Sequence, residues 1–208
     1  MGLTPVAPDE VATVVTTLEM RTRPRPRPLP PSPLRLHRWD RPAPVAYRTL
    51  FARVGAPWLW YSRLAMAEAR LAAVLRDPAT AVFVAVDPAG VEVGLLEIDL
   101  SRAEVTEIAY LALIPELTGR GHGRWLMAHA LAHAWRPGVE RIRVRTCTLD
   151  HPKALGFYRA QGFTAASRTL ETFPDPRVLG LLPPEAAPQV PMLAPVQAPP
   201  AGTPAAAT

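Results

Sequence analysis

The stretch that decides the fold runs from Leu113 to Arg124 and reads LIPELTGRGHGR. It follows an apolar run over 105–114 that predicts a buried strand, and it leads into an apolar pattern over 121–135 that predicts a helix. Glycines at a helix start let the backbone approach a ligand, and the first turn offers unpaired N–H groups and the positive end of the helix dipole. Arg120 and Arg124 add positive charge. We therefore predict a phosphate or pyrophosphate site, the alternative being a glycine-rich turn that binds nothing.

Two common phosphate-binding motifs do not fit this loop. The dinucleotide fingerprint Gly-x-Gly-x-x-Gly requires its third glycine at position 126 or 124, where the sequence has Leu126 and Arg124. A P-loop requires Gly-Lys followed by Ser or Thr, and the chain has no such run. The predicted anion site is therefore of another kind.

The hydrophobic pattern on either side of the loop predicts a mixed α/β domain. Strands are expected where apolar residues alternate or form short runs bounded by turns, and helices where they recur with a period of 3.6. The predicted strands are 11–20, 34–39, 81–86, 91–100, 105–114, 142–146 and 163–173, and the predicted helices are 45–54, 61–76, 121–135 and 152–161.

Length and composition favour one domain with tails. The chain has 208 residues, 49% hydrophobic and 20% charged, so it can bury a core. Its single cysteine, Cys147, excludes a disulfide framework and cysteine-based metal sites, and we predict no metal. Every apolar run is shorter than the ~18 residues of a membrane span. The start MGLTPV lacks the features of a signal peptide, so we expect a cytoplasmic protein without a membrane partner.

Proline marks the predicted ends of the domain. Residues 1–33 comprise an N-terminal strand and the Arg/Pro-rich stretch RTRPRPRPLPPSP (21–33), which we expect to be extended. Residues 34–173 form the predicted domain, and the Pro/Ala-rich residues 174–208 are predicted to be a disordered tail. The Arg/Pro-rich stretch could contact nucleic-acid phosphates, but it lacks interleaved aromatic residues for stacking, so we interpret it as a solvated linker.

Two motifs in this arrangement resemble the GNAT superfamily of N-acetyltransferases. The family signature, Gln/Arg-x-x-Gly-x-Gly/Ala between the fourth strand and the third helix, is similar to Thr118-Gly119-Arg120-Gly121-His122-Gly123. Thr118 departs from the usual first residue, which removes one side-chain contact and leaves the glycines in place. The family's downstream motif, Asn-x-x-Ala-x-x-x-Tyr-x-x-x-Gly-Phe, is similar to the pattern of His151, Ala154, Tyr158, Gly162 and Phe163, with His in place of Asn. The resemblance covers roughly residues 34–173.

This resemblance implies a fold and a co-substrate. The fold would be a mixed, mostly antiparallel twisted sheet flanked by helices, with the fourth and fifth strands splayed by a bulge. Acetyl-CoA would bind as co-substrate along the fourth strand, with its pyrophosphate at the backbone amides of residues 120–124 and its pantetheine amides paired with residues 111–113 like an added strand. The implied cofactor-binding residues are Leu111, Ala112, Leu113, Thr118, Gly119, Arg120, Gly121, His122, Gly123 and Arg124.

Acetyl transfer to an amine needs a base, because an aliphatic amine with a pKa near about 10.4 is almost wholly protonated at pH 7. Glu107 is the candidate, since its place in the fourth strand resembles that of the base in the histone-acetyltransferase branch. Strand parity would put it on the face of Leu111 and Leu113. The alternative is a solvated residue at the start of a strand, in which case Glu97 or Asp99 would be the base.

The remaining candidates are aromatic. Tyr158 is the candidate acid for the leaving thiolate; the alternative is an aromatic side chain that only packs its helix. Trp58, Trp60 and Tyr61 precede the second predicted helix, where the superfamily commonly builds its acceptor pocket. These three could hold an apolar amine or a cation by their π-faces, or they could belong to the core.

The function predicted from these residues is N-acetyl transfer from acetyl-CoA to a primary amine of a small molecule or peptide. Two alternatives stay open: a non-catalytic CoA-binding regulatory module, and a nucleic-acid-associated protein that uses the Arg/Pro-rich stretch. The presence of both Glu107 and Tyr158 favours the enzyme. We expect a monomer or a homodimer.

Overall fold

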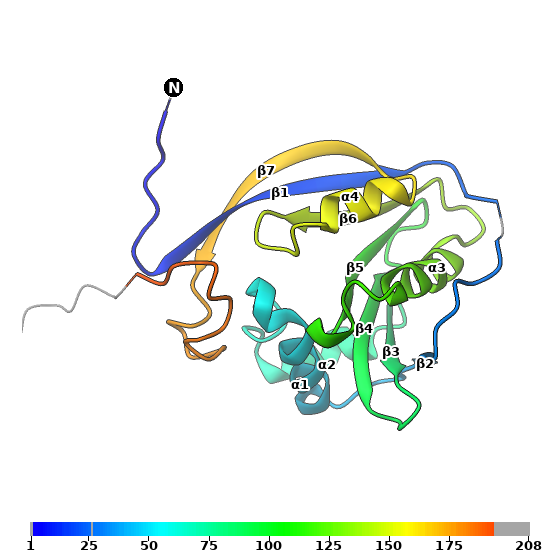
Figure 1. Cartoon of the computed structure of the whole chain (residues 1–208), viewed down its shortest axis with the longest axis horizontal. Coiled ribbons are helices and arrows are strands. Elements are labelled where there is room, and N and C mark those ends of the chain that lie inside the picture. The colour runs from blue at the N-terminus through cyan, green and yellow to red at the C-terminus, as the bar shows by residue number, and fades with distance from the viewer. Residues whose placement is uncertain (1, 26, 194–208) are drawn as a thin grey trace, which may run out of the picture.

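The computed structural model describes residues 2–25 and 27–193 and shows a seven-stranded sheet with helices packed against it (Figure 1). The strands are β1 (Glu10–Met20), β2 (Arg35–Arg38), β3 (Thr80–Val86), β4 (Glu92–Asp99), β5 (Val105–Leu113), β6 (Arg141–Cys147) and β7 (Thr164–Pro174). The helices are α1 (Pro44–Gly55), α2 (Glu68–Arg76), α3 (His122–Ala134) and α4 (Ala154–Ala160), with 3-10 turns η1 (Ala56–Trp58) and η2 (Pro115–Leu117). The strand order is β2-β3-β4-β5-β6-β1-β7, and β5 and β6 form the one parallel pair among the described strands. The predicted fold class is confirmed.

The helices α1 and α3 lie on opposite faces of the sheet. Glu97 of β4 points toward α1, where Tyr47 donates a hydrogen bond to it. The neighbouring Leu96 points to the other face, because successive side chains of a strand alternate. Phe83, which is opposite Leu96 on β3, stacks on His133 of α3 with ring centroids 4.4 Å apart.

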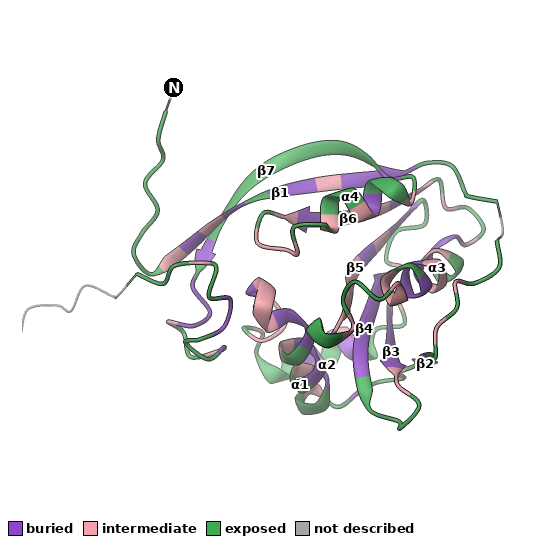
Figure 2. Ribbon diagram, viewed as in Figure 1, coloured by how far each residue is buried: buried purple, intermediate pink, exposed green. Residues whose placement is uncertain are grey.

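The main hydrophobic core occupies the space between the sheet and these helices, as the buried parts of β3 and β4 show (Figure 2). Both strands are buried along almost their whole length, because helices cover both of their faces. Helix α1 contributes an apolar stripe at i, i+3, i+4 and i+7 spacing, made of Tyr47, Leu50, Phe51 and Val54.

Helix α2 begins later than the sequence pattern predicts. The predicted helix covered 61–76, whereas α2 starts at Glu68, after Ala67 in extended backbone with ψ 145°. The side chains of Ser62 and Arg63 turn instead toward the sheet, where they contact Tyr110 and Glu97. Residues 61–67 are therefore a loop over the sheet, because these polar contacts replace the first two turns of the predicted helix.

Strand β1 lies inside the sheet, although the sequence analysis placed it in a segment before the domain. It pairs antiparallel with β6, with Val15 opposite Cys147. It also pairs antiparallel with β7, with Val11 opposite Phe173. The folded domain therefore includes residues 10–20. The local sequence indicates a strand but not its partners, which lie near the other end of the chain.

The segment from Asp175 to Val190, here called the C-terminal strap, packs on the domain. The sequence analysis assigned these residues to a disordered tail because of their Pro/Ala content. In the structure Leu182, Ala186 and Ala187 are buried in a second, smaller core, so this part of the prediction is corrected. Residues 194–208, the rest of the predicted tail, lie outside the described residues.

The described residues of the Arg/Pro-rich stretch run along the surface without regular structure between β1 and β2 (Figure 1). One contact joins this stretch to the predicted cofactor loop, because Ser32 Oγ lies 3.0 Å from His122 Nδ1. Among residues 2–25 and 27–193, no helix is long and apolar enough to cross a membrane.

Candidate active site

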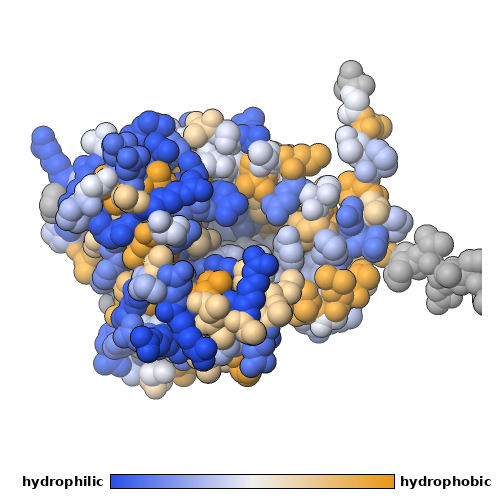
Figure 3. Space-filling model, turned by 180° about the vertical axis from the view of Figure 1, so that it is seen from behind, coloured by the Kyte–Doolittle hydropathy of each residue, from blue (hydrophilic) through white to orange (hydrophobic). Residues whose placement is uncertain are grey.

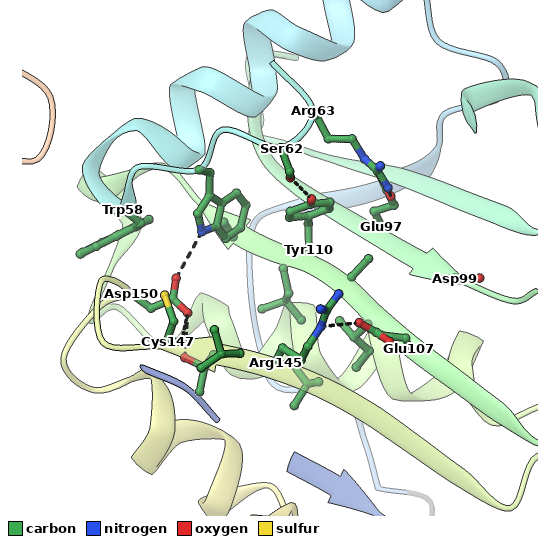
Figure 4. Close-up of a pocket in the computed structure, with 18 of the residues that line it drawn as sticks. Trp58, Ser62, Arg63, Glu97, Asp99, Glu107, Tyr110, Arg145, Cys147 and Asp150 are labelled. Atoms are coloured by element: carbon green, nitrogen blue, oxygen red, sulfur yellow. Dashed lines mark hydrogen bonds and ion pairs between the residues drawn. The ribbon is translucent and has the colours of Figure 1, made fainter. Parts of the chain in front are cut away.

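A cleft of about 750 Å³ opens where β5 and β6 separate (Figure 4). The two strands pair from Val105 opposite Arg141 to Ile108 opposite Val144, and no pairing is recorded beyond that point. The following residues of β5, 109–113, line the cleft and are only partly buried. The edge of β5 in this stretch is therefore available to an added extended chain, as the family resemblance implies for pantetheine.

A β-bulge in β5 determines which of its side chains share a face of the sheet with Glu97 and Asp99. Glu97 is opposite Tyr110 and Asp99 is opposite Glu107, so β5 carries one extra residue between these pairs. Glu107 and Tyr110 consequently share the face of Glu97 and Asp99. The expectation that Glu107 shares its face with residues 111 and 113 is wrong, because the bulge reverses the alternation between them.

Glu107 lies in the cleft with one cationic neighbour. Its side chain is 21% exposed, and its Oε1 accepts a hydrogen bond from Arg145 Nε at 2.9 Å (Figure 4). Asp99 is directly across from Glu107 on β4, is exposed, and accepts from the backbone of Ser101 at 2.8 Å. Glu107 therefore keeps a second carboxylate oxygen that Arg145 does not occupy.

Glu97 is already engaged on both of its oxygens. It is 1% exposed, and Tyr47 and Arg63 each donate to one of its oxygens. Burial and the Glu97 charge raise the pKa of Tyr47 well above its usual value. Burial alone would lower the pKa of Arg63, but Glu97 raises it overall. Glu97 is thus one half of a buried ion pair, which makes it less suited than Glu107 to exchange protons with a substrate.

Tyr158 reaches the same cleft from α4. It is buried, and burial together with the nearby Asp150 raises the pKa of its phenol well above the usual value. A phenol with a raised pKa keeps its proton throughout the neutral and mildly alkaline range. Tyr158 can therefore act as a proton donor. It also packs edge-to-face on Phe163, which fits the alternative role of an aromatic side chain that packs its helix.

The predicted cofactor loop has the backbone that close ligand approach needs. Gly119 and Gly121 have φ of 80° and 88°, which favours glycine, and Gly121 is the N-cap of α3. A Cβ at Gly119 would meet no atom within 4 Å, and one at Gly121 only the end of Arg124. In the described part of the chain, the amides of residues 119–123 donate to no acceptor. These free amides at the start of a 13-residue helix fit a pyrophosphate.

This loop borders the cleft without all of its residues lining it. Thr118 lines the cleft together with residues 111–113. Arg120 and Arg124 are exposed, while His122 is held by Ser32. The candidate cofactor residues thus form a continuous path from the strand edge to the start of α3.

The three predicted acceptor residues all line the cleft but differ in their surroundings. Trp58 lies against His151 with ring centroids 5.4 Å apart. Trp60 packs between Phe51 and Tyr110, so it belongs partly to the core. Tyr61 is stacked on an aromatic ring of β7 at 4.4 Å and an interplanar angle of 10°.

Arg145, Tyr110 and Asp150 line the cleft although the sequence pattern did not indicate them as site residues. Tyr110 points into the cleft because of the bulge, and its hydroxyl pairs with Ser62. Asp150 accepts hydrogen bonds from Trp60 Nε1 at 3.2 Å and from Thr146 Oγ1 at 2.8 Å, and so connects the segment that contains Trp60 to the end of β6. An acidic residue in the turn after a predicted strand was a usable signal for Asp150, whereas Tyr110 had none without the bulge.

The sequence model of the Acetyltransferase (GNAT) family matches residues 34–163. The chain belongs to the GNAT acetyltransferase family. Members of this family use acetyl-CoA. No curated protein matches the chain closely enough to count as a relative.

Solved structures support the same fold. A GNAT protein from Sphaerobacter thermophilus is 14% identical with a TM-score of 0.54, covering 78% of this chain and 52% of its own. A tandem GNAT protein of the clavulanic acid biosynthesis pathway is 19% identical with a TM-score of 0.54, covering 79% and 53%. An aminoglycoside acetyltransferase from an uncultured soil metagenomic sample is 21% identical with a TM-score of 0.52, covering 65% and 91%. The chain thus spans about half the length of the first two of these GNAT proteins.

Proposed function

We propose that this GNAT chain transfers an acetyl group from acetyl-CoA to a primary amine of a small molecule or peptide. One observation carries the proposal. Glu107 of β5 and Tyr158 of α4 line one cleft, and that cleft reaches Thr118 of the cofactor loop. A carboxylate with a free oxygen and a phenol that keeps its proton are the two groups that amide formation from a thioester requires.

Glu107 acts on the amine. The incoming ammonium gives one proton to the carboxylate oxygen that Arg145 leaves free, directly or through a water molecule, and the neutral nitrogen then attacks. Arg145 holds the other oxygen and so fixes the orientation of the carboxylate. The bond formed is N–C, and the bond broken is C–S.

Tyr158 acts on the leaving group. The thiolate takes the phenolic proton as the C–S bond breaks. The phenolate recovers the second proton that the nitrogen loses, and Glu107 releases the first to solvent, so the products are the amide, the CoA thiol and one proton. Bound acetyl-CoA supplies the thioester. The phenol is buried and lines the cleft.

The test is a thiol-release assay with acetyl-CoA across a panel of amines, amino acids and short peptides, with calorimetry of acetyl-CoA in parallel. We expect micromolar-range binding of acetyl-CoA, on the order of typical enzyme KM values, and release that depends on an amine. Acetyl-CoA hydrolysis without amine gives the background rate. Tight binding without turnover on any amine would favour the regulatory module, and absence of binding would overturn the proposal.

A further inference from the structure

The C-terminal strap is closed on itself by one buried arginine. Arg177 is 2% exposed in its side chain and forms an ion pair with Asp175, with donor–acceptor distances of 2.6 and 3.0 Å. The same guanidinium donates to the carbonyl oxygens of Ala186 at 3.1 Å and Val190 at 2.8 Å. The pair and the carbonyl bonds satisfy a charge that would otherwise be costly to bury, so the strap has one defined conformation.

The strap packs on the segment 57–61, which contains the predicted acceptor residues, and on β7. Leu182, which is 4% exposed, packs in the small core with Leu59 and Phe173. Gln189 Nε2 donates to the carbonyl oxygen of Pro57 at 2.7 Å. The strap therefore contacts η1 and Leu59 on one side and Phe173 near the end of β7 on the other.

The residues that the strap supports are themselves part of the cleft. Leu59, Tyr61, Leu149 and Phe173 line the cleft, and all four belong to or pack on the small core. Apolar and aromatic side chains make up most of this end of the cleft, with the carboxylate of Glu171 near Tyr61, whereas Glu107 and Arg145 form a charged pair in another part of the cleft. On the rear face, hydrophobic residues gather toward the end of the molecule that carries the strap (Figure 3).

We propose that the strap determines which amine is accepted. By holding the buried Leu59 and Phe173 in place, it fixes Tyr61 and Leu149, whose partly exposed side chains form an apolar wall that selects a primary amine bearing an aromatic or branched apolar group. Arg177 and Leu182 are then positioning residues, because they act through the wall and touch no substrate. The inference rests on the proposed function, and the strap itself, residues 175–190, lies outside the stretch 34–163 that matches the family.

The experiment compares Leu182→Ala with Leu179→Ala in the full chain. Leu179 lies in the same strap but is 53% exposed, so its variant is the matched control. Phenethylamine is the apolar probe amine and putrescine the polar one. For each variant we would measure KM and kcat for both amines, the Kd of acetyl-CoA, and hydrogen exchange of the peptide covering residues 57–61.

The expected result is selective. In Leu182→Ala, exchange of residues 57–61 accelerates and KM for phenethylamine rises about tenfold or more, the low end of what a hydrophobic pocket contact is worth. KM for putrescine, kcat and the acetyl-CoA Kd stay within about twofold of wild type. Leu179→Ala matches wild type throughout. Gln189→Ala removes one exposed hydrogen bond and no core side chain, so it should raise the KM for phenethylamine by a smaller factor. It is the variant to use if Leu182→Ala fails to fold.

Other outcomes would overturn the inference. An unchanged phenethylamine KM despite accelerated exchange means that the wall does not set acceptor affinity. A parallel rise in the acetyl-CoA Kd means that the strap only stabilises the fold. Wild type that acetylates neither phenethylamine nor putrescine would also overturn the inference, because the wall would then select no apolar amine. Failure of the proposed function is distinguished from this by the acetyl-CoA titration and by thiol release across the full amine panel.

Discussion

Replacing Glu107 by Gln should separate its chemical role from its structural one. The amide keeps an oxygen that can accept from Arg145 Nε, which lies 2.9 Å from Glu107 Oε1, so the local packing and the acetyl-CoA affinity should persist. What is lost is the base. Turnover at pH 7 should fall by about 10²–10⁴-fold, the usual contribution of positioned acid–base catalysis.

The size of the recovery at high pH follows from the amine. With a pKa near about 10.4, roughly one amine in 2,500 is neutral at pH 7 and roughly one in 25 at pH 9, a gain of about a hundredfold. Turnover of Glu107→Gln should therefore rise by up to about a hundredfold between these pH values, while wild type should change far less. The assay is thiol release at saturating acetyl-CoA, with calorimetry at each pH. Equal activity of variant and wild type from about pH 6 to 9 would refute Glu107 as the base and turn attention to Asp99.

Three further predictions use the same assays. Tyr158→Phe should lower turnover by about 10²-fold or more. High pH should not restore the activity, because it supplies neutral amine but no proton donor for the leaving thiolate, a role that the raised pKa of the Tyr158 phenol allows in wild type. Recovery of turnover at pH 9 would contradict this role. Gly121→Glu should abolish acetyl-CoA binding in calorimetry, while Gly138→Glu, which places the same side chain at a comparable φ of 84° away from the loop, should bind normally. Arg63→Ala leaves the buried Glu97 unpaired and should lower the free energy of unfolding by about 3–5 kcal/mol in urea titrations; a loss below about 1 kcal/mol would mean that solvent or another group compensates the charge.

Local signals predicted most of the elements correctly. Local patterns predict the glycine loop, its flanking strand and helix, and the position of Tyr158. Each pattern spans about 20 residues or fewer, a range in which periodicity and turn chemistry are decisive. Glu107, Trp58 and Tyr61 were named instead from the resemblance to the GNAT superfamily, and the structure brings them to one cleft.

Three features depended on contacts between distant residues and could not be predicted. The extra residue in β5 that turns Tyr110 into the cleft is a matter of register, and a shift of one residue reverses every side chain. A loop before Glu68 replaces the first turns of the predicted helix because Arg63 pairs with Glu97 of β4. The C-terminal strap was mistaken for a disordered tail because its composition is that of a tail, while the single Arg177 that closes it gives no periodic signal.

The place of β1 in the sheet has a consequence for how the chain folds. Strand β1, EVATVVTTLEM, is synthesised well before both of its partners, β6 (Arg141–Cys147) and β7 (Thr164–Pro174). At about 5–20 residues per second, this apolar strand waits on the order of ten seconds for them. During that time both of its edges are open to pairing with other chains. Closure of the sheet is therefore a late, long-range step, and long-range strand pairing is intrinsically slow.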